Sequence, residues 1–149
     1  MASSGQAGGS GLGYLGSVII PYTELPENAG GWPRPLLDVA VADLDEAVFP
    51  CLVDTGSLNS LLPRWIADAA GLGLQGAEVR RLSVAGTVTQ AWFWPVVLTA
   101  VDRAWEALVG FCDPWPYSWG LLGQPSFFRY FTVTFRAADL EFEIVPVPD

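Results

Sequence analysis

The stretch Leu52-Val53-Asp54-Thr55-Gly56-Ser57 decides how this sequence is interpreted. Residues 47–53 are mostly apolar and read as a β-strand, which delivers a single carboxylate into a tight turn. Gly56 lets the backbone come close and adopt unusual dihedral angles. Thr55 and Ser57 supply hydroxyls that can hold the carboxylate. Ser57 would bond to the outer oxygen of the carboxylate, and capping a local turn is a second, compatible role for it. An Asp-x-Gly triplet is also typical of a purely structural turn. Other parts of the chain therefore have to decide whether Asp54 is a functional carboxylate or only a turn residue.

The residue types that are missing narrow the possible chemistry. The 149 residues include no His, and all seven basic residues are Arg. Ser-His and Cys-His dyads, Schiff-base lysines and P-loop lysines are therefore excluded. Two Cys without His are too few for an ordinary zinc site, so we expect no metal and no cofactor. If the chain is an enzyme, its acid–base chemistry has to come from carboxylates.

Charge and hydropathy bear on partners and compartment. The net charge of −9 argues against nucleic acid, whose phosphates would be repelled. No apolar stretch approaches the 18 residues of a membrane span. Residues 1–13 are rich in Gly, Ser and Ala and are interpreted as a flexible leader; they lack the pattern of a signal peptide. With Cys51 and Cys112 interpreted as reduced, buried thiols, we expect a cytoplasmic protein.

Short apolar segments separated by turn residues predict a mainly β domain over residues 14–149. One helix is expected from Pro63 to Ala70, with Trp65, Ile66, Ala69 and Ala70 on its apolar face. The other expected elements are strands at 18–20, 36–42, 47–53 and 107–111, a long hairpin over 79–98 with its tip near Ala85-Gly86, a second short helix over 125–130, and a closing hairpin over 131–135 and 140–145.

Residues beyond the turn carry a resemblance to a known family. The continuous stretch Asp54-Thr55-Gly56-Ser57-Leu58-Asn59-Ser60-Leu61-Leu62-Pro63 resembles the active-site sequence of aspartic peptidases, both pepsin-like and retropepsin-like. The order of strand, Asp-Thr-Gly-Ser, helix, hairpin, Leu121-Leu122-Gly123, helix and strand matches that family over about residues 35–145. The resemblance implies a closed, barrel-like acid protease lobe of the retropepsin type, mainly β, with one or two short helices.

The same resemblance implies functional roles for several segments. Asp54 would be the catalytic residue, supported by Thr55, Gly56 and Ser57. Leu121, Leu122 and Gly123 would form the floor behind the active site. The hairpin tip, made of Val84, Ala85, Gly86 and Thr87, would be a flap that closes over substrate, although an ordinary hairpin turn fits the same residues. Residues 92–94 (Trp-Phe-Trp) are interpreted as core, with a substrate cleft or an interface as alternatives.

The implied mechanism needs two aspartates that share one proton around a water molecule. None of Asp38, Asp102, Asp113 and Asp139 is followed by Thr-Gly or Ser-Gly. The second carboxylate is therefore expected from a second copy in a homodimer with a peptide or protein substrate. The terminal strands at 18–20 and 140–145 are candidates for pairing across that dimer. Gln124-Pro125 stand where retropepsins usually carry Arg then Asn or Asp, so a non-catalytic binding or oligomerisation module with the same fold is the alternative.

Overall fold

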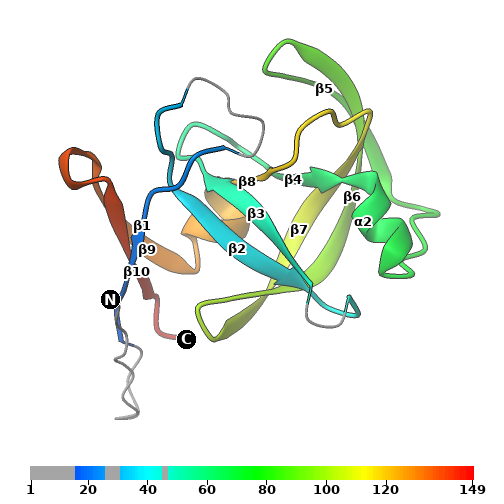
Figure 1. Ribbon diagram of the computed structural model, residues 1–149. Coiled ribbons are helices and arrows are strands. Elements are labelled where there is room, and N and C mark those ends of the chain that lie inside the picture. Colours follow the sequence, from blue (N-terminus) through cyan, green and yellow to red (C-terminus); the bar gives the residue numbers. More distant parts are fainter. Residues whose placement is uncertain (1–15, 26–30, 45–46) are drawn as a thin grey trace.

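A computed structural model describes residues 16–25, 31–44 and 47–149 (Figure 1). The expected leader over residues 1–13 lies outside the described residues. The strands are β1 (Val18–Pro21), β2 (Leu36–Val41), β3 (Val48–Val53), β4 (Ser60–Pro63), β5 (Glu78–Val84), β6 (Thr87–Ala100), β7 (Arg103–Asp113), β8 (Gly120–Leu122), β9 (Phe131–Arg136) and β10 (Glu141–Pro146). The helical elements are α2 (Arg64–Ala69), the π-helical turn η2 (Gln124–Phe128) and the 3-10 turn η3 (Ala137–Asp139).

Six strands close into a barrel. Their hydrogen-bonded order is β2-β3-β8-β4-β7-β6, and β6 returns to β2 through the pairs Ala40–Thr99 and Val41–Leu98. β5 pairs with the first half of β6 and projects beyond the barrel as a hairpin (Figure 1). The mainly β, closed-barrel architecture expected from the sequence is confirmed, and strands β6 and β7 are longer than the sequence pattern indicated.

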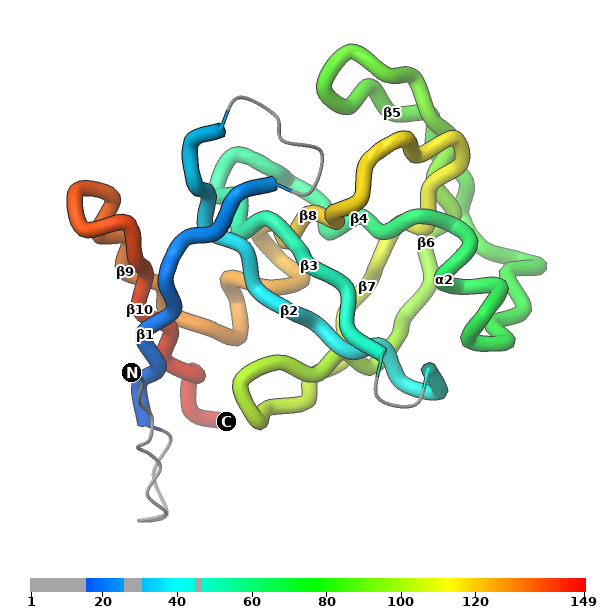
Figure 2. Tube along the Cα trace, in the orientation of Figure 1, coloured from blue at the N-terminus to red at the C-terminus, as the bar shows by residue number. Residues whose placement is uncertain are grey.

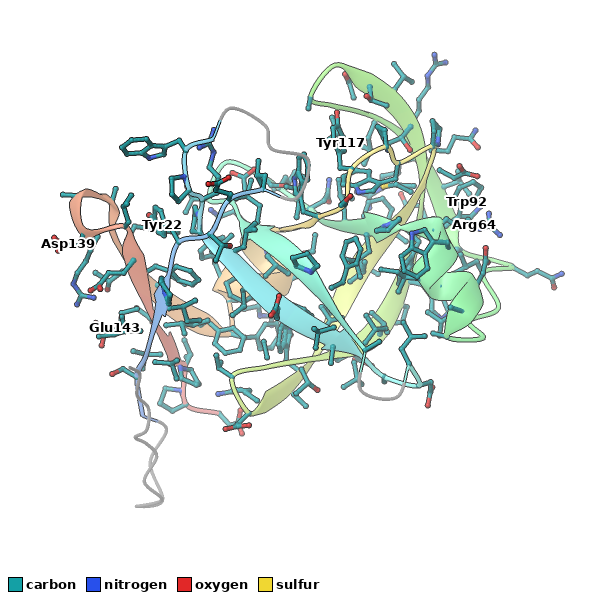
Figure 3. All side chains as sticks on the ribbon, in the orientation of Figure 1. Tyr22, Arg64, Trp92, Tyr117, Asp139 and Glu143 are labelled. Atoms are coloured by element: carbon teal, nitrogen blue, oxygen red, sulfur yellow. The ribbon has the colours of Figure 1, made fainter. Side chains whose placement is uncertain are left out.

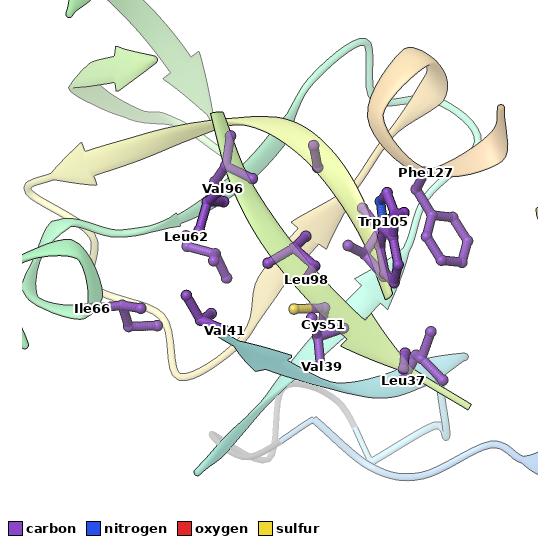
Figure 4. Packing of buried hydrophobic residues seen from close by; sticks show 14 of the residues in the cluster. Leu37, Val39, Val41, Cys51, Leu62, Ile66, Val96, Leu98, Trp105 and Phe127 are labelled. Atoms are coloured by element: carbon purple, nitrogen blue, oxygen red, sulfur yellow. The ribbon is translucent and has the colours of Figure 1, made fainter. Parts of the chain in front are cut away.

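The barrel interior holds the main hydrophobic core. Residues of β6 alternate between buried and exposed positions, so that Val96, Leu98 and Ala100 point inward while their neighbours face solvent. β2, β3 and β7 contribute Val39, Cys51 and other fully buried side chains to the same cluster (Figure 4). Both cysteines are buried free thiols, which agrees with their interpretation as core residues.

Outside the barrel, β1, β10 and β9 form a separate three-stranded antiparallel sheet (Figure 1). β10 lies in the middle, with β1 on one side through Val18–Ile144 and β9 on the other through Val133–Ile144. The expectation that residues 140–145 form a free edge for pairing across a dimer is therefore wrong, because both edges of β10 are occupied within the chain. The outer strands of this sheet are β1 and β9.

The first helix is present, but the expected apolar face is wrong. α2 buries Ile66 and Ala67, whereas Trp65 is 59% exposed and Ala69 is exposed. Trp65 instead packs edge-on against Phe49 at the surface, with ring centroids 6.0 Å apart. A helix of six residues contacts the barrel over little more than one turn, so a 3.6-residue pattern does not fix which side is buried. Among the described residues, no helix is long and apolar enough to cross a membrane.

Candidate active site

Asp54 follows directly after the last residue of β3, on a tight turn at one end of the barrel. The backbone N–H of Gly56 donates to Oδ1 of Asp54 at 2.9 Å, and the N–H of Ser57 donates to the carbonyl of Asp54 at 3.1 Å. Asp54 itself is half-buried, while Thr55 and Gly56 are exposed. The turn therefore presents an oriented carboxylate at the surface. Oδ1 accepts the bond from Gly56, and Oδ2 takes no part in that bond.

The short strand β8 positions this turn. It lies between β3 and β4, parallel to β3 through Val53–Leu122 and antiparallel to β4 through Leu61–Leu121. The chain thus leaves β3, forms the Asp54 turn and returns as β4 on the far side of β8. A further hydrogen bond from the N–H of Asp54 to the carbonyl of Leu122, at 3.0 Å, fixes the start of the turn. The sequence expectation that residues 121–123 lie behind Asp54 agrees with this geometry.

The three floor residues differ in what they contact. Leu122 is buried in the main core, whereas Leu121 packs against a second apolar cluster. Gly123 lies against the turn so closely that a Cβ atom there would be 2.6 Å from the carbonyl oxygen of Ser57 and would also overlap that of Asn59. Because both neighbours are backbone atoms, only glycine fits between β8 and the loop of residues 57–59.

A buried polar network holds the loop from below. Ser60 is 1% exposed, and its hydroxyl accepts hydrogen bonds from the N–H of Gly123 at 3.0 Å and from the hydroxyl of Ser126 at 2.5 Å. The carbonyl of Ser126 in turn accepts from the indole N–H of Trp105 at 2.7 Å. Satisfied buried networks of this kind are rigid, because breaking any one bond leaves a buried donor without a partner.

The β5–β6 hairpin ends at Ala85 and Gly86, both with positive φ, at +48° and +83°. The hydroxyl of Tyr117, in the loop between β7 and β8, lies 3.3 Å from the carbonyl of Val84 and 3.2 Å from that of Ala85. It is also 3.2 Å from the hydroxyl of Thr87. Figure 3 shows Tyr117 beneath the hairpin, so the tip expected to act as a flap is tethered to the chain's own loop.

An aromatic group supports this tether. The ring of Tyr117 contacts those of Trp115 and Trp119, with centroid distances of 5.3 Å to Trp115 and 4.7 Å to Trp119. The indole N–H of Trp115 donates to the carbonyl of Trp119 at 2.9 Å. In the trace, the segment carrying these rings runs between β8 and the hairpin (Figure 2). This segment, residues 114–119, is called the aromatic loop, and it connects the hairpin, through the Tyr117 hydroxyl, to β8.

The second apolar cluster joins the same three segments. Its buried members are Leu61, Ala91, Phe93 and Cys112. Partly buried side chains from the hairpin, the aromatic loop and the floor pack against it, namely Leu82, Val84, Trp115 and Leu121. Phe93 belongs to this cluster, and Trp92 and Trp94 pack against the main core, so the interpretation of residues 92–94 as core is confirmed.

Some site details differ from the sequence expectations. The hydroxyl of Ser57 donates to the carbonyl of Asn59 at 2.6 Å, which is its local-turn role, and the donor to the Asp54 carboxylate is the backbone N–H of Gly56. Tyr117 and the Ser60–Ser126 pair were missed, because only the folded chain brings their partners together. In the part of the chain that the structure describes, no group of three His, Cys, Asp or Glu residues could hold a metal ion.

The closed barrel, with β8 inserted behind the Asp-Thr-Gly-Ser turn, is the retropepsin-like fold. It is similar to the crystal structure of a retropepsin-like aspartic protease from Rickettsia conorii, with a TM-score of 0.59 and 13% identity over 91% of this chain and 94% of that one. It is also similar to the retroviral protease-like domain of Ddi1 from Leishmania major, with a TM-score of 0.51 and 13% identity over 66% of this chain and 79% of that one. No protein-family model and no curated protein matches the sequence.

Proposed function

We propose that this chain is an aspartic endopeptidase that works as a homodimer. The observation that carries the proposal is the oriented carboxylate of Asp54, held by the Gly56 N–H on a turn that β8 supports, within a retropepsin-like fold. The two similar solved structures are named as a retropepsin-like aspartic protease and a retroviral protease-like domain, which favours the same class of reaction. A compartment that keeps Cys51 and Cys112 reduced, such as the cytoplasm, suits the buried free thiols.

In the proposed reaction, Asp54 of each subunit flanks one water molecule. The ionised carboxylate takes a proton from the water as the water oxygen bonds to the peptide carbonyl carbon, and the protonated carboxyl of the other subunit gives its proton to the carbonyl oxygen. Collapse of the resulting diol breaks the C–N bond: the carboxyl that took the water's proton gives it to the leaving nitrogen, and the other, now ionised carboxylate takes a proton from a diol hydroxyl as the C=O bond re-forms. One carboxylate cannot take both roles in the same step, so the proposal requires two copies of the chain.

The substrate would be an extended peptide between the hairpin and the active-site floor. The hairpin offers backbone groups that can add strand-like hydrogen bonds to such a peptide. The region near the hairpin is apolar and aromatic, through Leu82, Val84 and Trp115. This favours apolar side chains next to the scissile bond.

The direct test is a peptide-library digest with wild type and Asp54→Asn from acidic to neutral pH. Asn keeps the side-chain size and removes both catalytic carboxylates of the dimer, so cleavage should fall by several orders of magnitude. Asp102→Asn is the matched control, because Asp102 is exposed in the β6–β7 turn with φ of +61°, a conformation that Asn also tolerates. It should cleave like wild type.

Other outcomes separate the rival interpretations. Equal cleavage by wild type and Asp54→Asn would show that Asp54 is not the catalytic group. Wild type that cleaves nothing under any condition would favour a binding or oligomerisation module with this fold. Sedimentation at the assay concentration completes the test, because a monomer that still cleaves peptides would contradict the shared-proton scheme.

A further inference from the structure

Gln124 contacts the active-site turn at two points. Its backbone N–H donates to the carbonyl of Ser57 at 3.0 Å, and its side-chain Nε2 donates to the carbonyl of Thr55 at 2.7 Å. These two carbonyls lie on either side of Gly56. A single residue at the start of η2 therefore spans the turn and holds both of its arms.

The side-chain bond of Gln124 is linked to the Asp54 carboxylate by a single peptide unit, the one between Thr55 and Gly56. The carbonyl of Thr55 and the N–H of Gly56 belong to the same planar, trans amide, so they point in opposite directions and move together. Gln124 holds the oxygen end of that plane, and the N–H end donates to Oδ1 of Asp54 at 2.9 Å. Fixing the Thr55 oxygen thus fixes the direction of the donor that orients Asp54. Donation to the oxygen also polarises the amide and strengthens its N–H as a donor.

We infer that Gln124 is a positioning residue for the Asp54 carboxylate, acting through the Thr55–Gly56 peptide; this rests on the proposed function. The role requires a hydrogen-bond donor at the end of the side chain. It does not require a charge, since the acceptor is a neutral carbonyl. Gln124 stands where the retropepsin pattern usually carries Arg, so here a neutral amide bonds to the turn within one chain.

The requirement for a donor gives a test that depends on pH. Gln124→Glu has nearly the same shape, but an ionised Glu only accepts hydrogen bonds and would face the Thr55 carbonyl with like polarity. A protonated Glu has one O–H to donate, and an exposed Glu is protonated below about pH 4. The kcat of Gln124→Glu should therefore approach wild type at pH 3 and fall roughly tenfold below it near pH 6, with a smaller change in KM.

Two further variants separate positioning from a general structural effect. Gln124→Ala lacks any donor and should lose roughly tenfold in kcat at every pH. Gln75→Glu places the same carboxylate on an exposed residue of the loop between α2 and β5, so its activity should follow wild type across the pH range. Urea midpoints measured alongside show whether each variant keeps the fold.

The inference is overturned if the activity of Gln124→Glu relative to wild type is the same at pH 3 and pH 6, or if Gln124→Ala matches wild type throughout. Either result would leave the proposed function standing, because wild type still cleaves. If wild type cleaves nothing, the proposed function fails, and amide hydrogen exchange of Gly56 decides the inference instead. Exchange should be faster in Gln124→Ala than in wild type and Gln75→Glu, and equal rates would overturn it.

Discussion

Replacing Gly123 by alanine tests how tightly β8 is packed against the turn that carries Asp54. Gly123 has φ of −122° and ψ of −170°, an extended conformation that alanine adopts readily, so backbone strain is not the issue. The added methyl group would instead lie 2.6 Å from the carbonyl oxygen of Ser57 and overlap that of Asn59. Neither oxygen can rotate away, because each is part of the backbone between Asp54 and β4.

The expected loss of stability combines two effects. Overpacking a site that cannot relax costs about 1–3 kcal/mol. Moving the loop aside also stretches the bonds from Gly123 N–H to Ser60 and from Gln124 N–H to Ser57, each with a net contribution of about 1 kcal/mol. Gly123→Ala should therefore lower the free energy of unfolding by about 3–5 kcal/mol, a large share of the total for a domain of this size.

Urea denaturation at fixed protein concentration measures this loss, and Gly73→Ala is its control. Gly73 is exposed, and a Cβ there has no atom within 4 Å, so the same substitution should be neutral or stabilise by about 0.5 kcal/mol. Equal unfolding midpoints for Gly123→Ala and Gly73→Ala would refute the reasoning, since they would mean that the loop moves away from β8 without cost.

Two further predictions concern the hairpin and the thiols. Tyr117→Phe removes the hydroxyl that bonds to the carbonyls of Val84 and Ala85, so amide exchange at the hairpin tip should speed up while the barrel stays protected; unchanged exchange would show that the hydroxyl does not tether the tip. Burial raises the pKa of both Cys51 and Cys112 from 9.0 to about 12. Iodoacetamide at pH 8 should therefore label them only after unfolding. The pKa of each thiol is higher in the folded chain than in the unfolded chain, so burying the neutral thiols stabilises the fold fully below pH 9. This contribution to the free energy of unfolding is lost as pH rises towards 12, and urea midpoints across that range measure the loss.

The sequence predicted those parts of the fold that depend on neighbouring residues. The apolar strand before Asp54 and the turn residues after it are local features, and both lie where they were expected. The β5–β6 hairpin was also predicted, because alternating residues flank Ala85-Gly86 and the positive φ values at the tip suit a tight turn. The closing hairpin of β9 and β10 followed from the same kind of pattern.

The errors concern contacts between distant segments. The bond between Gln124 and Thr55 joins residues 69 positions apart, and it exists only because β8 pairs with β3 in a particular register. The pairing of β1 with β10 likewise depends on where the first and last strands meet. Trp65 was placed on one apolar helical face with Ile66, Ala69 and Ala70 because of their spacing, yet on this six-residue helix Trp65 is exposed while Ile66 is buried. Periodicity indicates which residues share a face, but only the tertiary packing decides which face is covered.

The hydrogen bonds around Asp54 indicate that one chain can form its turn without help from a second subunit. The donors and acceptors described here, from Gly56, Leu122, Gly123 and Gln124, all belong to one chain. On the proposed mechanism, pairing then supplies the second carboxylate and does not have to build the first. A variant that pairs poorly should accordingly keep its fold and the protection of the Gly56 N–H while losing cleavage. Loss of that protection on dilution to monomer would instead mean that the two subunits build each other's turn.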